Sequence, residues 1–307
     1  MANAPVLVAG AAGGVQGSTG NLVARGLLEK GIPVRAFVRT DDDRAAALRT
    51  QGAEVYVGDL REIADVGPAL RGVERAFFTY PVRDGLLEAS AVFAGAAARE
   101  GVRQVVEVSQ LAPEPHAGTP RLRQHWVSEQ VFDHAGVGAV HLRATVFYEN
   151  IRALITTGPN GYQLVMPLGG QDAVLPLVGG RDVARVAVGV LAAPEVRPAG
   201  FHRLVAEFAS VSDVMTAFEV ATGRPLRYVD VPSQAWKQSM LDNGLNAHAA
   251  AHLTSLWEVF RAAGAANWVD PAYERDDAIA RIGGQRAQTL EEFLRSNANH
   301  FGSVGTP

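Results

Sequence analysis

A glycine-rich segment near the start of the chain is the first place where residue types and spacing could support chemistry. From Val6 to Gly20 it reads VLVAGAAGGVQGSTG, an apolar run followed by closely spaced glycines. Glycine permits a tight turn and a close approach of the backbone to a phosphate, and the N-terminus of a following helix attracts the anion. This order predicts a site for the pyrophosphate of a dinucleotide. A glycine-rich turn without a ligand is the alternative.

The loop can be divided by expected role. We expect Gly10 and Gly13 to make the turn and Gly20 to pack the helix against the sheet. The interval from Gly13 to Gly20 is four residues longer than the usual two-residue gap, and we expect the extra stretch, which includes Gly17, to fold over the phosphates. Side-chain hydrogen bonds are offered there by Gln16, Ser18 and Thr19.

The end of the second predicted strand bears on which dinucleotide is preferred. Proteins that prefer NAD often carry Asp or Glu at this place, whereas this chain carries Arg39. A guanidinium suits the 2′-phosphate of NADP through paired, charge-assisted hydrogen bonds. We therefore expect NADP(H) to be preferred over NAD(H). A solvated Arg39, or one engaged by the carboxylates of Asp41 to Asp43, is the alternative.

Two later loops are expected to complete the cofactor site. Asp59 and Leu60 follow the third predicted strand, in a place suited to flanking the adenine. Thr79, Tyr80 and Pro81 follow the fourth strand, where the nicotinamide ribose should run. Each segment is also compatible with an ordinary connection between a strand and a helix.

The residues for ordinary carbonyl reduction are incomplete. A short-chain dehydrogenase uses a serine with a Tyr-x-x-x-Lys pair, in which the tyrosine gives a proton and the lysine lowers its pKa. Ser109 ends the fifth predicted strand, as that serine would. The segment that should hold the pair reads RLRQH from Arg121 to His125, without tyrosine or lysine. Reduction by that pair is therefore not expected.

His125 is the main catalytic candidate, since it could donate a proton near neutral pH or orient a cofactor ribose. A helix-capping or surface histidine is the alternative. Tyr80 and Tyr148 are the other catalytic candidates, and packing is the alternative for Tyr148. The expected walls of a substrate pocket are Trp126, Tyr148 and Asn150.

Composition excludes several functional classes. The chain has 307 residues, no cysteine, 48% hydrophobic residues and a net charge of −4, so thiolate chemistry and broad electrostatic binding of nucleic acid are not expected. His248 and His252 have the spacing of metal ligands, but no third ligand is evident and we expect no metal. No signal peptide or membrane span is expected, which favours a cytoplasmic protein. For partners we expect a small-molecule acceptor, and a homodimer is left open.

The first half of the chain alternates short apolar runs with alanine- and leucine-rich segments, which is typical of βα units around a parallel sheet. The runs are almost continuously apolar, as when helices cover both faces. We expect a Rossmann-type, doubly wound α/β domain over residues 1–150, with a returning strand and helix near 175–192. The expected strands are Pro5 to Ala9, Val34 to Val38, Glu54 to Val57, Arg75 to Thr79, Val105 to Ser109 and Ala139 to Arg143.

Residues 151–307 are expected to form a smaller α+β domain on the substrate side. Ser210 or Ser212 should cap a helix that Gly223 ends. The expected helices are 21–30 and 126–135 in the first domain, 181–191 in the returning segment, 211–222, and a pair within 233–264 that breaks near Gly244.

Several of these motifs together resemble the NmrA-like group of atypical short-chain dehydrogenases, particularly bacterial quinone reductases and triphenylmethane reductases. The resemblance covers nearly the whole chain. It rests on the glycine loop, Val38-Arg39, Gly58-Asp59-Leu60, the run HWVSE from His125, HLR from His141, FYEN from Phe147 and GRPL from Gly223. The resemblance implies NADPH binding, a small substrate-side domain and absence of the Tyr/Lys pair.

The group holds both enzymes and cofactor-sensing regulators, so two hypotheses follow. In the first, NADPH delivers hydride directly to an electron-poor acceptor such as a quinone, an enone or a dye. In the second, the protein binds NADP(H) without turnover and reports redox state to a protein partner. The absence of a charged arm or an exposed heptad pattern in the sequence favours the enzyme.

Overall fold

The computed structural model describes residues 4–14, 18–263 and 273–301. Contacts divide the described residues into two compact units, and the chain passes between them several times. The first unit takes those within Met1–Ala144, Gly180–Leu204 and Asp276–Arg286, and the second takes those within Thr145–Gly179, Val205–Arg275 and Ala287–Pro307. The predicted boundary at residue 150 lies close to the first passage, and two later segments return to the first unit. The expected returning helix is present at Gly180–Leu191, but the strand expected with it near residue 175, Val174–Val178, belongs to a sheet of the second unit, and Gly200–Leu204 joins the parallel sheet instead.

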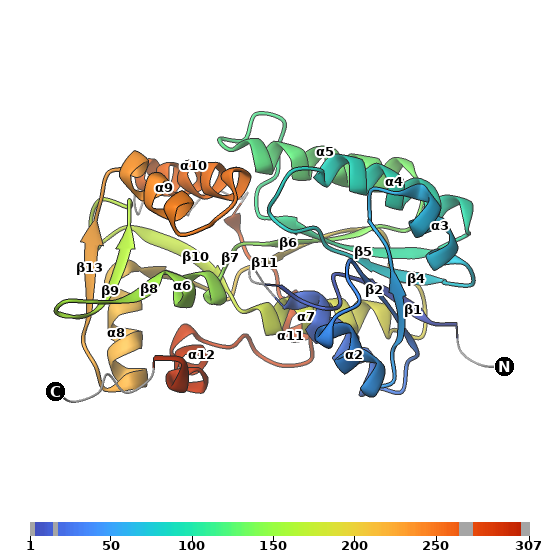
Figure 1. Cartoon of the computed structure of the whole chain (residues 1–307), viewed down its shortest axis with the longest axis horizontal. Coiled ribbons are helices and arrows are strands. Elements are labelled where there is room, and N and C mark those ends of the chain that lie inside the picture. The colour runs from blue at the N-terminus through green and yellow to red at the C-terminus, as the bar shows by residue number, and fades with distance from the viewer. Residues whose placement is uncertain (1–3, 15–17, 264–272, 302–307) are drawn as a thin grey trace. The chain divides into compact units, whose positions relative to one another are not determined.

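A parallel sheet organises the first unit (Figure 1). Among the described residues it has seven strands in the order β11-β6-β5-β4-β1-β2-β3. Their bounds are β1 Val6–Ala9, β2 Val34–Val38, β3 Glu54–Val57, β4 Arg75–Phe78, β5 Gln104–Gln110, β6 Val140–Ala144 and β11 Gly200–Leu204. Neighbouring strands are all parallel. The order reverses between β1 and β4, as in a doubly wound Rossmann-type fold, and this confirms the expected fold class.

Helices cover both faces of this sheet, as Figure 1 shows. On one face α3, α4 and α5 pack side by side, and on the other α1 packs along α7. Their bounds, with those of α2 and α11, are α1 Thr19–Leu28, α2 Asp43–Thr50, α3 Ile63–Leu70, α4 Leu86–Arg99, α5 Pro120–His134, α7 Gly180–Leu191 and α11 Ala278–Arg281. The central strand β1 is a continuous apolar run because helices bury both faces of the sheet there, whereas the residues of the edge strand β3 are half-buried or exposed.

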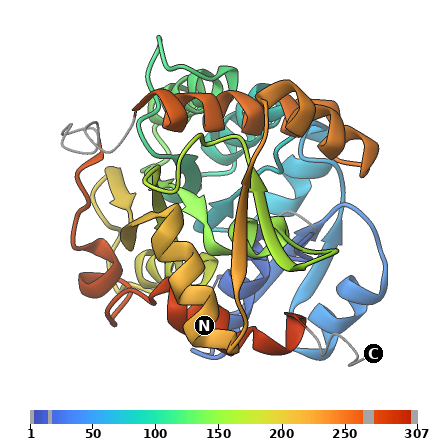
Figure 2. The same cartoon turned by 90° about the vertical axis from the view of Figure 1, so that its left-hand side faces the viewer.

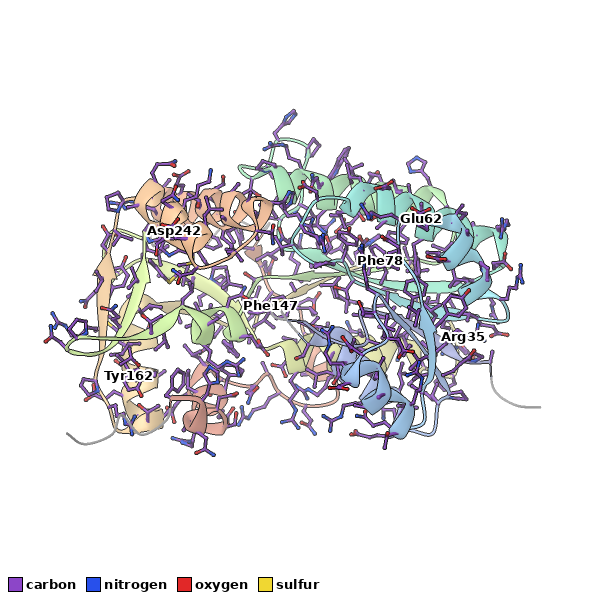
Figure 3. All side chains as sticks on the ribbon, viewed as in Figure 1. Arg35, Glu62, Phe78, Phe147, Tyr162 and Asp242 are labelled. Atoms are coloured by element: carbon purple, nitrogen blue, oxygen red, sulfur yellow. The ribbon has the colours of Figure 1, made fainter. Side chains whose placement is uncertain are left out.

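The layer beneath α4 and α5 is a close-packed aromatic cluster. Phe78 of β4, labelled in Figure 3, lies with its ring centroid 5.0 Å from that of Phe93 and 5.1 Å from that of Phe132. All three side chains are buried. Tilted pairs at this distance contribute beyond their buried area, so the cluster fixes α4 and α5 over the centre of the sheet.

The start of α5 differs from the sequence-based expectation. The predicted helix began at Trp126, whereas α5 begins at Pro120. Thr119 is its N-cap, and the Thr119 hydroxyl accepts a hydrogen bond from the Leu122 amide at 3.1 Å. Proline is favoured at the first helical position because its missing N–H would have no intrahelical partner. His125 therefore lies within the helix and is not a capping residue.

Among the described residues the second unit contains two small sheets, with helices on either side of them (Figure 2). The sheets have the orders β12-β10-β7 and β13-β9-β8, each with one parallel and one antiparallel pair. The strand bounds are β7 Val146–Phe147, β8 Ile155–Gly158, β9 Gly161–Met166, β10 Val174–Val178, β12 Glu207–Ser210 and β13 Leu226–Asp230. In Figure 2 the green β8–β9 hairpin lies beside the orange β13.

The helices of the second unit follow their sequence signals closely. Ser210 caps α8 in a reciprocal capping box with Asp213, and Gly223 ends it with φ 70°. The predicted pair of helices near Gly244 is also present. The bounds are α6 Tyr148–Leu154, α8 Val211–Thr222, α9 Ser233–Asp242, α10 Ala247–Ala263 and α12 Leu290–Ser296, followed by a short 3-10 helix Ala298–Phe301. Among the described residues no helix is long and apolar enough to cross a membrane.

Candidate dinucleotide site

The glycine loop joins β1 to α1 at the carboxyl end of the sheet. Gly10 and Gly13 have φ of 69° and 67°, a region that favours glycine, and the Gly13 amide donates to the Gly10 carbonyl at 3.0 Å. Gly20 lies in the first turn of α1, where a Cβ would be 2.5 Å from the Gly10 carbonyl oxygen. The close approach of strand and helix therefore requires glycine at position 20, as the sequence indicated.

Other predicted residues of the loop are placed with less detail. Ser18 is exposed at the N-terminus of α1, and Thr19 is half-buried in its first turn. The side-chain amide of Asn21 donates to the Ala11 carbonyl at 3.0 Å, which ties the helix to the loop. Gln16 and Gly17 lie outside the described residues. In the described part of the loop, the turn at Gly10 and Gly13 therefore lies next to the N-terminus of α1. A phosphate-binding loop needs this arrangement.

Arg39, at the end of β2, is more than half exposed and lies 3.2 Å from the carboxylate of Asp59. Two of the three carboxylates that could compete for Arg39, those of Asp41 and Asp42, have other partners. Asp41 binds Arg49 at 2.7 Å, and Asp42 binds Arg44 while capping α2. Asp59, which follows β3, is the acidic residue that faces Arg39.

Arg44 was not identified from the sequence. Its Nη1 donates to the Gly13 carbonyl at 3.1 Å, so a side chain from α2 contacts the glycine loop. Arg61 is the other cation of this group, and it binds Asp59 at 2.9 Å. The structure thereby gathers Arg39, Arg44 and Arg61 around the carboxyl ends of β1, β2 and β3. Only the arginine directly after a strand had a signal in the sequence.

Asp59, the carboxylate beside Arg39 and Arg61, is expected to make a pH-dependent contribution to the free energy of unfolding. The hydrogen bond from Arg61 lowers the pKa of Asp59 to about 2, against burial, which raises it. A lowered folded-state pKa stabilises the protein above the ordinary pKa of the carboxyl group and loses this effect as the pH falls toward 2. We expect Asp59→Asn to cost about 1 kcal/mol of unfolding free energy near pH 6 and progressively less below pH 4.

Urea unfolding of both proteins between about pH 3 and pH 6 measures this difference. A difference that is constant over the whole interval would contradict the assigned role of Asp59. Asp43→Asn, a change at an exposed carboxylate in the first turn of α2, is the control for a general effect of charge.

The loop after β4 is held by a buried cation. The Thr79 side chain lies close to Gly10, where a Cβ would be 2.8 Å from the Thr79 methyl group. Arg121 of α5, only 1% exposed, donates to the carbonyls of Tyr80 and Pro81 at 3.3 and 3.0 Å. Burial lowers the pKa of Arg121 to about 10, so the guanidinium stays charged at neutral pH. Arg121 appeared in the sequence only as part of the segment without the Tyr/Lys pair.

The tyrosine of that loop is a weak acid in this setting. The Tyr80 hydroxyl donates to the Asp84 carbonyl at 3.0 Å. Burial raises the pKa of Tyr80, while the charge of Arg61 lowers it, with a net upward shift. Tyr80 is therefore neutral near pH 7 and can donate a hydrogen bond, but it does not act as a base.

Two polar residues are buried beside this loop. Ser109 is the penultimate residue of β5 and is 1% exposed, and its hydroxyl has no hydrogen-bond partner among the described residues. His125 of α5 is 5% exposed, and Trp126 beside it is half-buried. Ser109 and His125 thus belong to the layer between the sheet and α5. Both lie toward the carboxyl end of the sheet.

The predicted pocket residues Tyr148 and Asn150 belong to α6 of the second unit. Tyr148 is completely buried, and its hydroxyl donates to Glu207 at 2.5 Å and lies 3.0 Å from the Gln288 carbonyl oxygen. This placement assigns Tyr148 to the core of the second unit, so it does not support a catalytic role. Asn150 is half-buried.

No group of residues in the described part of the chain has the arrangement of a metal site. His248 and His252 both lie on α10, and His252 is buried.

A model of the NmrA-like family matches residues 3–294. The chain belongs to the NmrA-like family. Among its relatives, the NAD(P)H azoreductase of Xenophilus azovorans is 26% identical over 293 residues, 95% of this chain and 98% of that protein. The sterol demethylase protein B of Methylococcus capsulatus is 30% identical over 255 residues, 71% of this chain and 76% of that protein.

Solved structures with the same fold include both enzymes and a regulator. The triphenylmethane reductase of a Citrobacter species, complexed with NADP(H), has a TM-score of 0.76 and 20% identity and covers 95% of this NmrA-like chain and 99% of its own. The NADPH-dependent quinone oxidoreductase of Escherichia coli, complexed with NADPH, has a TM-score of 0.77, 19% identity and the same coverage. NmrA, a negative transcriptional regulator in complex with NADP, has a TM-score of 0.80 at 18% identity and covers 100% of this chain and 99% of its own.

Proposed function

We propose that this protein is an NADPH-dependent reductase that transfers hydride directly to a small electron-poor acceptor such as an azo compound, a quinone or a cationic dye. The observation that carries this proposal is the match to an NAD(P)H azoreductase over 95% of the chain, in a protein whose glycine loop has the close strand-to-helix approach of a dinucleotide site. The bound cofactor supplies the hydride. The residues of the site bind and orient the cofactor and supply the proton.

The residues fit NADP(H) better than NAD(H). The loop from Gly10 to Gly20 receives the pyrophosphate at the N-terminus of α1. Arg39 carries a positive charge beside this loop and is exposed enough to accept a 2′-phosphate. An NAD-binding protein would gain nothing from a cation there, because the ribose hydroxyl of NAD prefers an acidic partner. NADPH is therefore the preferred donor.

The catalytic step needs close positioning and one proton. A neutral acceptor such as a quinone or an azo compound becomes an anion when it takes up hydride, and this anion is neutralised by a proton, whereas a cationic dye becomes neutral and needs none. His125 is the proton donor in this proposal, since an imidazole titrates near neutral pH. Arg121 acts through the loop after β4, because its hydrogen bonds to the Tyr80 and Pro81 carbonyls fix the loop that borders the nicotinamide ribose.

A cofactor sensor without turnover is the second candidate. It is favoured by the likeness of the fold to NmrA, a negative transcriptional regulator solved in complex with NADP. Both candidates use the same dinucleotide cradle. They differ in whether an acceptor oxidises the bound NADPH.

Acceptor reduction by the wild type and by His125→Ala tests the proposal, because only a reductase oxidises bound NADPH with an acceptor. The wild type is expected to oxidise NADPH only when an azo dye or quinone is present, and His125→Ala is expected to lower kcat about 100-fold, with the dissociation constant of NADPH changed less than about threefold. The steady-state rate of acceptor reduction gives kcat, and fluorescence titration gives the dissociation constant of NADPH. Arg123→Ala, at an exposed position on the same helix, is the control. A wild type that binds NADPH but reduces no acceptor would favour the sensor.

A further inference from the structure

Two arginines share one carboxylate at the carboxyl end of the parallel sheet. Asp59 follows β3, and its Oδ2 lies 2.9 Å from Nη2 of Arg61 and 3.2 Å from Nη1 of Arg39. Because Arg39 is the residue proposed to bind the 2′-phosphate of NADPH, a carboxylate beside it competes with that phosphate for its charge. The share of Asp59 that each arginine holds therefore bears on the choice of cofactor.

Arg61 is the principal partner of Asp59. Oδ1 of Asp59 accepts hydrogen bonds from the backbone N–H and from Nε of Arg61 at 3.0 and 3.2 Å, and Oδ2 accepts one from Nη2 at 2.9 Å. The hydrogen bond from the Arg61 side chain is also the largest cause of the lowered pKa of Asp59, about 2, ahead of the charge of Arg39. One arginine from the same loop thus holds both oxygens of the carboxylate.

The Arg61 side chain is fixed in the place where it makes these contacts. A Cβ at Gly85 would lie 3.0 Å from Cδ of Arg61 and 2.8 Å from the hydroxyl oxygen of Tyr80, so the stem of Arg61 packs against the start of α4. Its Nη1 lies 4.0 Å from the carboxylate of Glu88 on that helix. The Arg61 side chain is 36% exposed and that of Arg39 is 58% exposed. Of the two arginines, Arg39 is therefore the more accessible to a ligand.

Arg39 keeps most of its hydrogen-bonding capacity beside Asp59. A guanidinium carries five N–H donors on three nitrogens, and the contact of Arg39 with Asp59 engages one nitrogen, Nη1, at 3.2 Å. A phosphate is recognised by two parallel N–H donors of an arginine. The arrangement thus leaves Arg39 able to receive a phosphate, provided that Asp59 does not take more of its donors.

The preceding loop repeats this arrangement. Asp42 and Arg44 follow β2 and are also two residues apart, and the backbone N–H of Arg44 donates to Oδ1 of Asp42 at 3.0 Å while its Nη2 donates to Oδ2 at 2.6 Å. In the loops after β2 and β3, an arginine two residues after an aspartate therefore binds that aspartate. These two Asp-x-Arg turns give two carboxylates near Arg39 a cation of their own.

We propose that Arg61 is a specificity-determining residue, which holds Asp59 and so keeps Arg39 available to the 2′-phosphate of NADPH. This inference rests on the NADPH preference in the proposed function. Without the Arg61 side chain, Asp59 loses two hydrogen bonds, and Arg39, already at 3.2 Å, replaces them. A phosphate then has to displace Asp59 and meets its uncompensated negative charge. NADH has no 2′-phosphate and is not affected.

Arg61 is a positioning residue in this proposal, because it acts through Asp59 on Arg39. The quantity to measure is the ratio of the dissociation constant of NADH to that of NADPH, obtained by fluorescence titration of the protein with each cofactor. This ratio cancels any effect on the part of the site that both cofactors share. A merely structural role of Arg61 would weaken both cofactors and leave the ratio unchanged.

The test compares the wild type with Arg61→Ala, Asp59→Asn and the double variant. Arg61→Ala is expected to lower the ratio about tenfold, since the phosphate loses about one charge-assisted hydrogen bond. Asp59→Asn is expected to keep or raise the ratio. The double variant is expected to return to within about threefold of Asp59→Asn, because the competing charge is gone. Arg61→Gln keeps the part of the side chain that packs near Gly85 and is expected to behave like Arg61→Ala.

Arg103→Ala is the matched control. Arg103 is an exposed arginine 3.6 Å from the carboxylate of Glu74, and the two residues directly precede β5 and β4. They therefore lie at the amino ends of the strands, away from the cofactor loops. This change removes the same charge from the same unit and is expected to keep the ratio within about twofold of the wild type.

The double variant decides between an indirect and a direct role of Arg61. If its ratio stayed as low as that of Arg61→Ala, Arg61 would bind the phosphate itself, and the inference would be overturned. An unchanged ratio in both Arg61→Ala and Arg61→Gln, with a wild type that prefers NADPH, would also overturn it. A wild type that binds the two cofactors equally would show that the NADPH preference has failed, and the inference would fail with it.

Discussion

Replacing Arg39 with alanine is expected to weaken the binding of NADPH by about 10- to 100-fold and to leave the binding of NADH within about twofold. The reason is that only NADPH carries the 2′-phosphate, and a hydrogen bond to a charged group contributes about 1.5–3 kcal/mol. Each 1.4 kcal/mol corresponds to about a tenfold change in the dissociation constant. Fluorescence titration of the two cofactors against the wild type and the variant measures the difference.

The control for this prediction is Arg49→Ala. Arg49 is also an exposed arginine of the first unit, and it is paired with Asp41 at 2.7 Å, but it lies on α2 and has no assigned contact with the cofactor. Its replacement should change neither dissociation constant by more than about twofold. Equal losses for NADPH and NADH in Arg39→Ala would mean that Arg39 does not recognise the 2′-phosphate.

The second large effect is expected at the crossing of strand and helix. A Cβ at position 20 would lie 2.5 Å from the Gly10 carbonyl oxygen and 2.9 Å from that of Ala9. Both are backbone atoms, so Gly20→Ala must move α1 away from β1 and with it the helix terminus that receives the pyrophosphate. We expect affinity for both cofactors to fall by at least about 100-fold, together with a loss of about 2 kcal/mol of stability.

Gly14→Ala is the matched control. Gly14 lies in the same loop, but a Cβ there would have no atom within 4 Å, and its φ is not positive. Calorimetric titration of both variants, with urea unfolding in parallel, separates the effects on binding and stability. If Gly20→Ala bound NADPH as tightly as Gly14→Ala, the crossing at Gly10 would not form the cofactor cradle.

Much of the fold could be predicted because local and long-range signals agree. β2 and β3 have the predicted bounds, because short runs rich in β-branched and aromatic residues between polar turns are typical of strands. α8 also has its predicted bounds, because Ser210 and Gly223 are strong end signals. The start of α5 was predicted six residues late, at Trp126. Buried polar residues such as Arg121 and Ser128 obscure the apolar pattern of this helix, and the Thr119-Pro120 start signal was overlooked.

The site could be predicted where its residues belong to the glycine loop or stand within two residues of the end of a strand. Gly10, Arg39 and Asp59 have the second position, and the structure places them at the carboxyl ends of β1, β2 and β3. Arg44 and Arg121 act from helices on backbone carbonyls of distant loops, and such contacts leave no pattern in the sequence.

The contacts of the buried Glu107 with Ser128 and His141 also depend on packing. They join residues from β5, β6, α4 and α5, which come together only when the helices pack on the sheet. For Tyr148 the sequence position was misleading. It follows β7 shortly after the first segment of the first unit ends, but the second unit buries it in its core, where its hydroxyl binds Glu207.

The most direct test of the proposed function is the rate of NADPH oxidation by the purified protein in the presence of azo dyes, quinones, enones and cationic dyes, with NADH measured in parallel. Turnover is expected to depend on the acceptor, with kcat/KM higher for NADPH than for NADH. Tight binding of NADPH without turnover on any of these acceptors would contradict the reductase and leave the cofactor sensor as the better description.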